Sequence, residues 1–253
     1  MSKTTLRINP KYEPLRTFIA SLPARFEQEG DYVYGGKRNL IKRFEAPDGT
    51  KLNVKRYHQP AFINRWVYSC GLRKPKGQRA FEYPTLLLAK GIDTPEAVAY
   101  IEERHGGLLG MSYFVSIQCA YPNQLYELGD ATPEVYEPMA RALAHFTAQM
   151  HDQEVLHRDY SPGNILWEKA GNDYHFSIVD INRMYFGPVT MEQGCRNFSR
   201  LWGPKRFIQL LVRHYAQERG FDPEEAERIT LKARRKFWTR YLRKREVGFK
   251  VEF

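Results

Sequence analysis

The sequence predicts an α+β fold of two lobes, a β-rich N-terminal lobe followed by a mainly helical C-terminal lobe. Two observations indicate this class. Short runs of β-branched and aromatic residues concentrate before residue 120, and longer stretches with helical periodicity follow. A chain of 253 residues can bury a sizeable core and suits one domain of two lobes. We therefore place the lobes at residues 1–120 and 121–253.

The N-terminal lobe opens with a predicted three-stranded meander. Its strands are short β-prone runs separated by turn-forming residues, at Tyr32 to Tyr34, Leu40 to Phe44 and Leu52 to Tyr57. The dipeptide Asp48-Gly49 between the last two runs is a strong hairpin signal. One helix and two further strands complete the lobe, over Gly77 to Lys90, Ala97 to Glu103 and Met111 to Gln118.

Three helices are predicted in the C-terminal lobe. Residues Pro133 to His151 carry their apolar side chains at helical spacing, and a second helix covers Pro204 to Arg219. The last helix begins after Asp222, which is a typical N-cap, and has Pro223 at its first position. The first of these helices leads directly into a loop rich in polar residues.

Composition narrows the protein class. The 39 Lys and Arg residues exceed the 29 Asp and Glu residues by ten, which favours an anionic partner such as a nucleotide, a phosphorylated sugar, nucleic acid or an acidic membrane surface. Three distant cysteines indicate neither a disulfide framework nor a zinc site. No run approaches the roughly 18 apolar residues of a membrane span, and the N-terminus lacks an apolar signal core. We expect a cytoplasmic protein.

The stretch LHRDYSPGNILW, Leu156 to Trp167, holds residues suited to phosphoryl transfer. Asp159 and Asn164 stand at the spacing H-R-D-x-x-x-x-N, and Asp180 follows the β-prone run FSIV. Transfer from ATP needs a carboxylate that orients the attacking hydroxyl and accepts its proton, and oxygen ligands for Mg²⁺. Asp159 is the predicted base, and Asn164 and Asp180 are the predicted metal ligands. The structural alternative is a turn in which Asp159 caps a helix and Asn164 is left-handed.

This set of motifs resembles the protein-kinase-like superfamily, which implies a bilobal protein-kinase-like fold. The resemblance implies that Lys55, on the third strand, contacts the ATP phosphates and that Glu82, on the following helix, orients it. Gly35 and Gly36 in YGGKRN allow close approach to phosphate, although the G-x-G-x-x-G pattern is missing and a plain hairpin turn is the alternative. His157 is expected to form hydrogen bonds beneath the loop without transferring protons.

The acceptor is indicated by departures from the protein-kinase pattern. Ser161 replaces the lysine two residues after the base, Asn182 replaces the glycine of Asp-Phe-Gly, and no Ala-Pro-Glu motif follows. Further stretches resemble the lipopolysaccharide core kinases that phosphorylate Kdo or heptose: INRWVY, RKPKGQRAFEYPTLLLAKGIDTP, VDINRM and CRNFSRLW. The resemblance implies ATP-dependent phosphorylation of a sugar hydroxyl in the lipopolysaccharide inner core. An atypical serine/threonine protein kinase and a non-catalytic nucleotide-binding scaffold remain open.

Basic residues suggest where anionic groups bind. Arg183, Arg196 and Arg200 follow the metal aspartate and are candidates to face an anionic glycan. Lys232 to Arg245 contain eight Lys or Arg, no acid and several aromatic residues. Such a helix can lie on anionic headgroups at the inner membrane, or it can be a packed C-terminal helix with a solvated basic side. Nucleic-acid binding is disfavoured because no recognised binding module is present.

Overall fold

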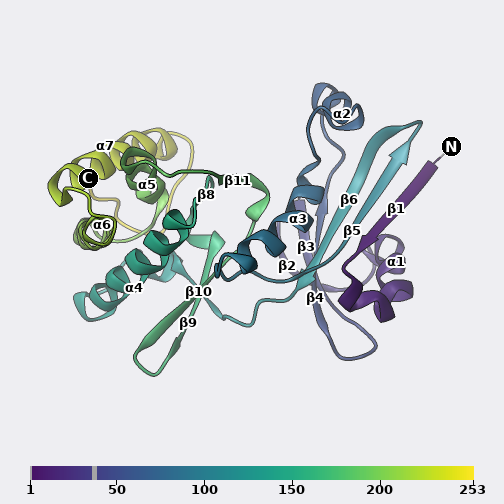
Figure 1. Ribbon diagram of the computed structural model, residues 1–253, viewed down its shortest axis with the longest axis horizontal. Helices are drawn as coiled ribbons and strands as arrows, with labels where there is room; N and C mark the ends of the chain where they lie inside the picture. Colours follow the sequence, from purple (N-terminus) through teal and green to yellow (C-terminus); the bar gives the residue numbers. More distant parts are fainter. Residues whose placement is uncertain (1, 36–38) are drawn as a thin grey trace. The chain divides into compact units, whose positions relative to one another are not determined.

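The computed structural model describes residues 2–35 and 39–253, so the predicted phosphate-loop residue Gly36 lies outside the described residues. The chain divides into two compact units, Met1–Ala120 and Tyr121–Phe253. The first is dominated by a β-sheet and the second by helices (Figure 1).

A six-stranded antiparallel sheet forms the first unit, in the order β1-β5-β6-β4-β3-β2. The strands are β1 (Ser2–Ile8), β2 (Asp31–Gly35), β3 (Asn39–Glu45), β4 (Lys51–Tyr57), β5 (Ala97–His105) and β6 (Leu108–Ile117). The helices are η1 (Pro10–Leu15), α1 (Arg16–Arg25), α2 (Phe62–Ser69) and α3 (Lys76–Ala89). The five strands and the helix predicted for this lobe are all present, and β1, η1, α1 and α2 are additional elements.

The two faces of the sheet are covered by different helices. On one face, Ile19 and Leu22 of α1 pack into a core with Leu52 and Val54 of β4. On the other face lies α3, where Gly77 packs so closely that a Cβ there would meet the Tyr100 ring at 2.6 Å. Because successive strand residues alternate between faces, Lys55 lies on the α3 side.

The second unit holds three long helices and two small sheets. Its helices are η2 (Leu125–Leu128), α4 (Pro133–Asp152), η3 (Pro162–Asn164), η4 (Ile181–Arg183), α5 (Met191–Asn197), η5 (Phe198–Arg200), α6 (Lys205–Glu218) and α7 (Pro223–Leu242). Its strands are β7 (Asn123–Gln124), β8 (Val155–His157), β9 (Ile165–Ala170), β10 (Asp173–Ile178) and β11 (Met184–Phe186). They form sheets in the orders β10-β9-β7 and β11-β8. The three predicted helices are confirmed, and Asp222 caps α7 by accepting a hydrogen bond from the Glu225 amide at 2.6 Å.

Helix α7 is packed into its unit through its aromatic side. Trp238 is buried against Phe237, Tyr241 and Phe249. Arg234 is fully buried, and its guanidinium group donates hydrogen bonds to the carbonyl oxygens of residues 201, 203 and 252. The structure shows that one side of this basic segment is packed, and contact of its solvated basic side with anionic headgroups stays a prediction.

Candidate active site

His157 lies beneath the predicted catalytic loop and supports it through hydrogen bonds. Its Nε2 lies 2.9 Å from the Val179 carbonyl oxygen, and its Nδ1 lies 3.1 Å from the backbone nitrogen of Asp159. The amide must donate to Nδ1 and the carbonyl must accept from Nε2, so the ring is a neutral tautomer. Complete burial lowers its pKa, which keeps it neutral. As expected, His157 hydrogen-bonds beneath the loop and ties it to the end of β10.

Asn164 closes the same loop from the other side. Its Nδ2 donates to the Asp159 carbonyl oxygen at 2.8 Å, and its backbone carbonyl accepts from the Val179 amide at 3.0 Å. The side-chain nitrogen is thereby committed to the loop, which leaves Oδ1 as the atom suited to a cation. The alternative of a left-handed Asn164 is not what the structure shows, since Glu154 and Asp180 are the non-glycine residues with positive φ in the described chain.

Asp180 occupies a strained position two residues after the end of β10. Its φ and ψ of 55° and 41° are left-handed, a conformation that is costly for residues other than glycine and that often marks functional sites. Its Oδ1 accepts a hydrogen bond from Asn182 Nδ2. The Oδ1 of Asn182 is buried and has no hydrogen-bond partner among the described residues. A carboxylate and amide oxygens are the ligand types that Mg²⁺ takes together with phosphate oxygens, so the residues present suit this ion.

Two arginines meet at the carboxylate of Asp159. Arg200 Nη1 contacts Oδ1, and Arg183 Nη1 lies 3.5 Å from Oδ2. The Arg200 guanidinium also lies over the ring of Phe237 in α7, at 5.4 Å from the centroid. Arg196 is not brought to this place and pairs with Glu192 at 2.7 Å on the surface. The sequence indicates these arginines only as candidates to face a glycan. The contact of Arg200 with Asp159 spans 41 positions, and no short motif indicates such a contact.

The first unit holds Lys55 and Gly35, two of the residues predicted to bind nucleotide. Lys55 is buried within β4, with its Nζ 5.4 Å from the centre of the Tyr57 ring. Gly35 ends β2 with a φ of 114°, and a Cβ there would lie 2.1 Å from the Asn39 carbonyl oxygen. Only glycine suits that position.

Glu82 of α3 contacts cations at the edge of the sheet. Its carboxylate lies 3.2 Å from Arg7 Nη1 of β1, 2.7 Å from Lys74 Nζ and 2.9 Å from Gln78 Nε2. Partial burial raises its pKa and these hydrogen bonds lower it, and the lowering prevails. Three strand spacings, about 14 Å, separate β1 from the β4 strand of Lys55. The orienting role of Glu82 at Lys55 stays a prediction.

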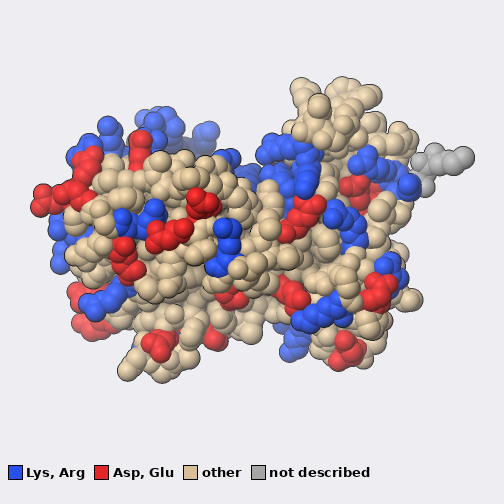
Figure 2. All heavy atoms as spheres, viewed as in Figure 1, with Lys and Arg blue, Asp and Glu red and all other residues tan. Residues whose placement is uncertain are grey.

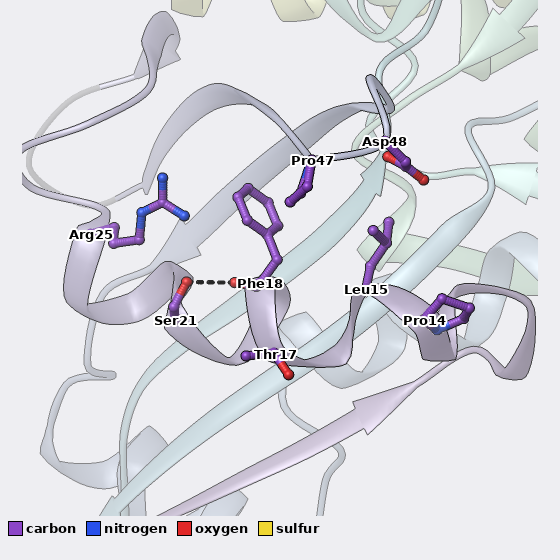
Figure 3. Close-up of a pocket in the computed structure, with 8 residues that line it drawn as sticks. All are labelled: Pro14, Leu15, Thr17, Phe18, Ser21, Arg25, Pro47 and Asp48. Carbon is purple, nitrogen blue, oxygen red and sulfur yellow. Dashed lines mark hydrogen bonds between the residues drawn. The ribbon is translucent and has the colours of Figure 1, made fainter.

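A shallow groove of about 600 Å³ lies beside α1, lined by η1, α1 and the turn at Pro47 and Asp48 (Figure 3). Its walls include Phe18 and Leu15, and Ser21 is turned back onto the Phe18 carbonyl oxygen. The groove belongs to the α1 face of the sheet, opposite the face of Lys55. It contains none of the residues predicted to carry chemistry.

Comparison with known proteins supports a kinase. Residues 27–201, more than half of the chain, match the model of the Lipopolysaccharide kinase (Kdo/WaaP) family. Among solved structures, WaaP in complex with acyl carrier protein is similar with a TM-score of 0.60 and 18% identity, over 94% of this chain and 99% of that chain. The streptomycin-ATP-APH(2")-IIa ternary complex is similar with a TM-score of 0.54 and 12% identity, over 92% and 89% of the chains. No curated protein matches. The predicted bilobal protein-kinase-like fold is confirmed.

Proposed function

Because the chain belongs to the lipopolysaccharide kinase (Kdo/WaaP) family, we propose that this kinase transfers the γ-phosphate of ATP to a hydroxyl group of an inner-core sugar. Of the two candidate acceptors, we favour Kdo over heptose. The observation that carries the proposal is the loop in which Asp159, Asn164 and Asp180 are fixed by hydrogen bonds to their neighbours. The same set disfavours a non-catalytic scaffold, which has no need of all three residues.

Asp159 is the proposed catalytic base. Its carboxylate orients the sugar hydroxyl and accepts its proton as the oxygen attacks the γ-phosphorus. A new bond forms between the sugar oxygen and phosphorus, the bond to the β–γ bridging oxygen breaks, and ADP leaves. The backbone of Asp159 is held by His157 and Asn164, so the carboxylate is positioned before the acceptor arrives.

Asn164 and Asp180 are the proposed ligands of Mg²⁺, through Asn164 Oδ1 and the Asp180 carboxylate. Bound magnesium supplies positive charge that offsets the charge of the phosphates. Asn182 fixes the Asp180 carboxylate by donating to its Oδ1. In the first unit, Lys55 is the proposed contact of the α- and β-phosphates, and Gly35 is the proposed point at which the backbone comes close to them.

The arginine pair suggests the kind of acceptor. Arg183 and Arg200 place two guanidinium groups around Asp159, and Arg200 is additionally steadied by Phe237. Guanidinium groups bind carboxylates and phosphates by paired hydrogen bonds. An acceptor that carries its own carboxylate, as Kdo does, can replace the Asp159 carboxylate as the partner of these arginines. This matching of charge is the reason to rank Kdo before heptose.

The decisive experiment follows labelled γ-phosphate from ATP into purified acceptors that end in Kdo or in heptose. Asp159→Asn keeps the size of the side chain, and we expect it to lower transfer by at least about a hundredfold while Mg-ATP binding, measured by calorimetry, is retained. Thermal melting is the folding control. Transfer by the variant at the parental rate would exclude Asp159 as the base. Labelling of protein and of no glycan would favour the protein-kinase alternative.

A further inference from the structure

Helix α2 exposes its apolar side chains to solvent. Phe62 and Ile63 are each 76% exposed, Trp66 is 50% exposed, and Leu72 in the turn that follows is 81% exposed. These four residues are called the α2 face below. Large apolar side chains gathered on one short helix are uncommon on a free surface and usually mark an interaction site.

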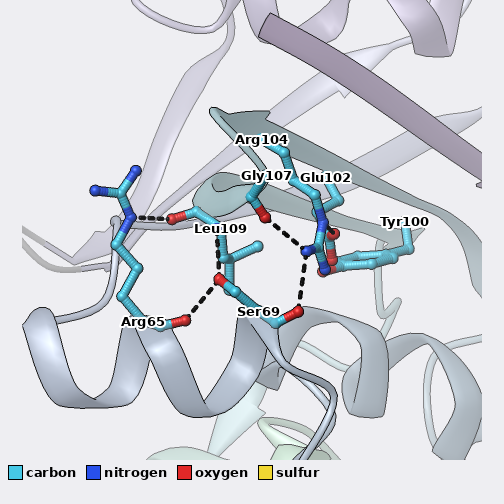
Figure 4. Close-up of polar contacts among 7 residues, drawn as sticks. All are labelled: Arg65, Ser69, Tyr100, Glu102, Arg104, Gly107 and Leu109. Atoms are coloured by element: carbon cyan, nitrogen blue, oxygen red, sulfur yellow. Dashed lines mark hydrogen bonds and ion pairs between the residues drawn. The ribbon is translucent and has the colours of Figure 1, made fainter. Parts of the chain in front are cut away.

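The opposite side of α2 is fastened to the β5–β6 hairpin (Figure 4). Arg65 Nε donates to the Leu109 carbonyl oxygen at 2.8 Å, and the Leu109 amide donates to Ser69 Oγ at 2.8 Å. Arg104 Nη1 donates to the Ser69 carbonyl oxygen at 3.4 Å. Tyr68 on the same side is buried. The helix is therefore anchored with its apolar side outward.

The anchor is itself supported by a buried acidic group. Glu102 accepts a hydrogen bond from the Tyr100 hydroxyl at 2.6 Å and pairs with Arg104 Nε at 2.5 Å, and it is only 8% exposed. A buried carboxylate with both partners in place holds Arg104 in one position. The direction in which α2 presents its apolar side is thus fixed in part by Arg104, which Glu102 holds in place on β5.

Positive charge predominates in the chain segment that holds the α2 face, although Lys74 within it pairs with Glu82 at 2.7 Å. Residues 58–81 contain no Asp or Glu and five Lys or Arg, namely Arg65, Arg73, Lys74, Lys76 and Arg79. On the face seen in Figure 2, no charged side chain is visible at the protruding tip formed by α2, and Lys and Arg gather beneath it. These five Lys and Arg residues are called the basic collar. Apolar side chains with a basic collar beside them are complementary to a surface that is negatively charged outside and apolar within.

We propose that the α2 face inserts into the headgroup region of a membrane containing anionic lipids. Trp and Phe side chains are favoured at that depth, and adjacent Lys and Arg residues are attracted to anionic headgroups. No helix within the described residues combines the length and hydropathy needed to cross a bilayer. The proposal concerns surface attachment and does not depend on the identity of the phosphorylated sugar.

Vesicle flotation tests the apolar part of the proposal. We expect the protein to float with vesicles of phosphatidylethanolamine and phosphatidylglycerol, and to bind phosphatidylcholine vesicles far less. Phe62→Ser with Ile63→Ser and Trp66→Ser should lower the binding at least about tenfold, since full burial of even one side chain of this size contributes at least about a tenfold factor. The matched control is Val135→Ser with Leu242→Ser, two exposed apolar residues on other helices that should leave binding unchanged.

Charge reversal tests the basic collar. Arg73→Glu beside the α2 face should weaken binding to anionic vesicles several-fold, and added salt should remove the difference because exposed charges are screened. Lys236→Glu makes the same change of charge on α7 and should have a smaller effect. Equal effects of the two substitutions would assign the attraction to net charge alone and overturn the assignment to α2.

A third measurement does not depend on the folding of the triple variant. Brominated lipids quench tryptophan fluorescence at the headgroup and upper acyl depth, and we expect the parent to be quenched more than Trp66→Phe. Identical quenching would overturn the proposal, as would unchanged flotation of the triple variant. A parent that is dimeric and a triple variant that is monomeric, with no vesicle binding by either, would show that a second copy covers the α2 face instead.

Discussion

The two units of the chain fix their polar side chains in different ways. In the second unit, several of the bonds that position the candidate site join residues close in sequence, such as Asp159 to Asn164 and Asp180 to Asn182. In the first unit, the predicted site residue Glu82 is joined to strand β1 by a contact with Arg7, 75 positions away. A site built from local bonds has a readable spacing. A site whose residues are brought together by strand pairing has no fixed spacing in the sequence. Short motifs can therefore predict the first kind of site and cannot predict the second.

The largest effect should come from the strained residue of the second unit. We expect Asp180→Ala and Asp180→Gly each to lower phosphate transfer about a thousandfold, because each removes a proposed metal ligand and its charge. Glycine adopts the left-handed conformation without a steric cost, so Asp180→Gly should be about 1 kcal/mol more stable than Asp180→Ala. Single-turnover transfer and urea denaturation measure the two effects. Equal stability of the two variants would show that the backbone at Asp180 is not strained.

The difference between the units also explains which predictions from the sequence succeeded. The fold class, the three long helices and the hydrogen bonding of His157 were predicted, since each follows from periodicity, a cap or a short motif. The contact of Arg200 with Asp159 was not predicted, because it depends on how η5 is folded back towards the loop.

Missed elements in the first unit have a different explanation. Helix α1 and the residues that flank it carry Leu15, Ile19, Leu22 and Phe26 at helical spacing, and all four are buried. The signal was present, but Pro23 and the mixed polar sequence around it obscured the periodicity. Strand β1 has no such signal, since its residues are largely exposed and its position at the sheet edge is set by pairing with β5.

The second largest effect is expected at Arg234, a buried arginine of α7, and it can be compared with that of an exposed arginine on the same helix. Burial lowers its pKa to about 10, yet it stays charged at neutral pH and is bonded to three backbone carbonyl groups. Arg234→Met should lower the free energy of unfolding by about 3 kcal/mol, because buried carbonyl groups lose their donors. The exposed neighbour in Arg235→Met should change it by less than about 0.5 kcal/mol. Similar urea midpoints for both variants would contradict the packed role of this helix.

A pH dependence should follow from His151 in the second unit. Burial, followed by the charge of Arg219, lowers its pKa to about 3, and its Nδ1 lies 2.8 Å from the Tyr215 hydroxyl. The unfolded chain binds a proton at this residue below about pH 6.5 and the folded chain does not. Stability from the neutral ring is therefore complete above pH 6.5 and falls on acidification, by up to about 1.4 kcal/mol per pH unit.

Urea denaturation between pH 7 and pH 5 measures this slope. His151→Gln removes the titrating group and keeps a side chain that can hydrogen-bond to Tyr215, so its unfolding free energy should depend less steeply on pH than that of the parent. His145 is the matched control, because it is an exposed histidine of the same helix. A parental slope in His151→Gln, or an equal reduction in His145→Gln, would assign the acid sensitivity to other groups.

The smallest effect on stability is expected at Glu82, whose contact with Arg7 is the long-range contact of the first unit named above. Its contacts with Arg7 and Lys74 are partly exposed ion pairs, and such pairs contribute less than about 1 kcal/mol. Glu82→Gln should therefore lower the free energy of unfolding only slightly, and Arg7→Gln should do the same because it breaks the same contact with β1. If the edge of the sheet is all that Glu82 serves, both variants keep the parental affinity for ATP in calorimetry. A tenfold loss of affinity in Glu82→Gln but not in Arg7→Gln would instead place Glu82 at Lys55, as the kinase resemblance implies, and would mean that its carboxylate exchanges Arg7 for Lys55 when nucleotide binds.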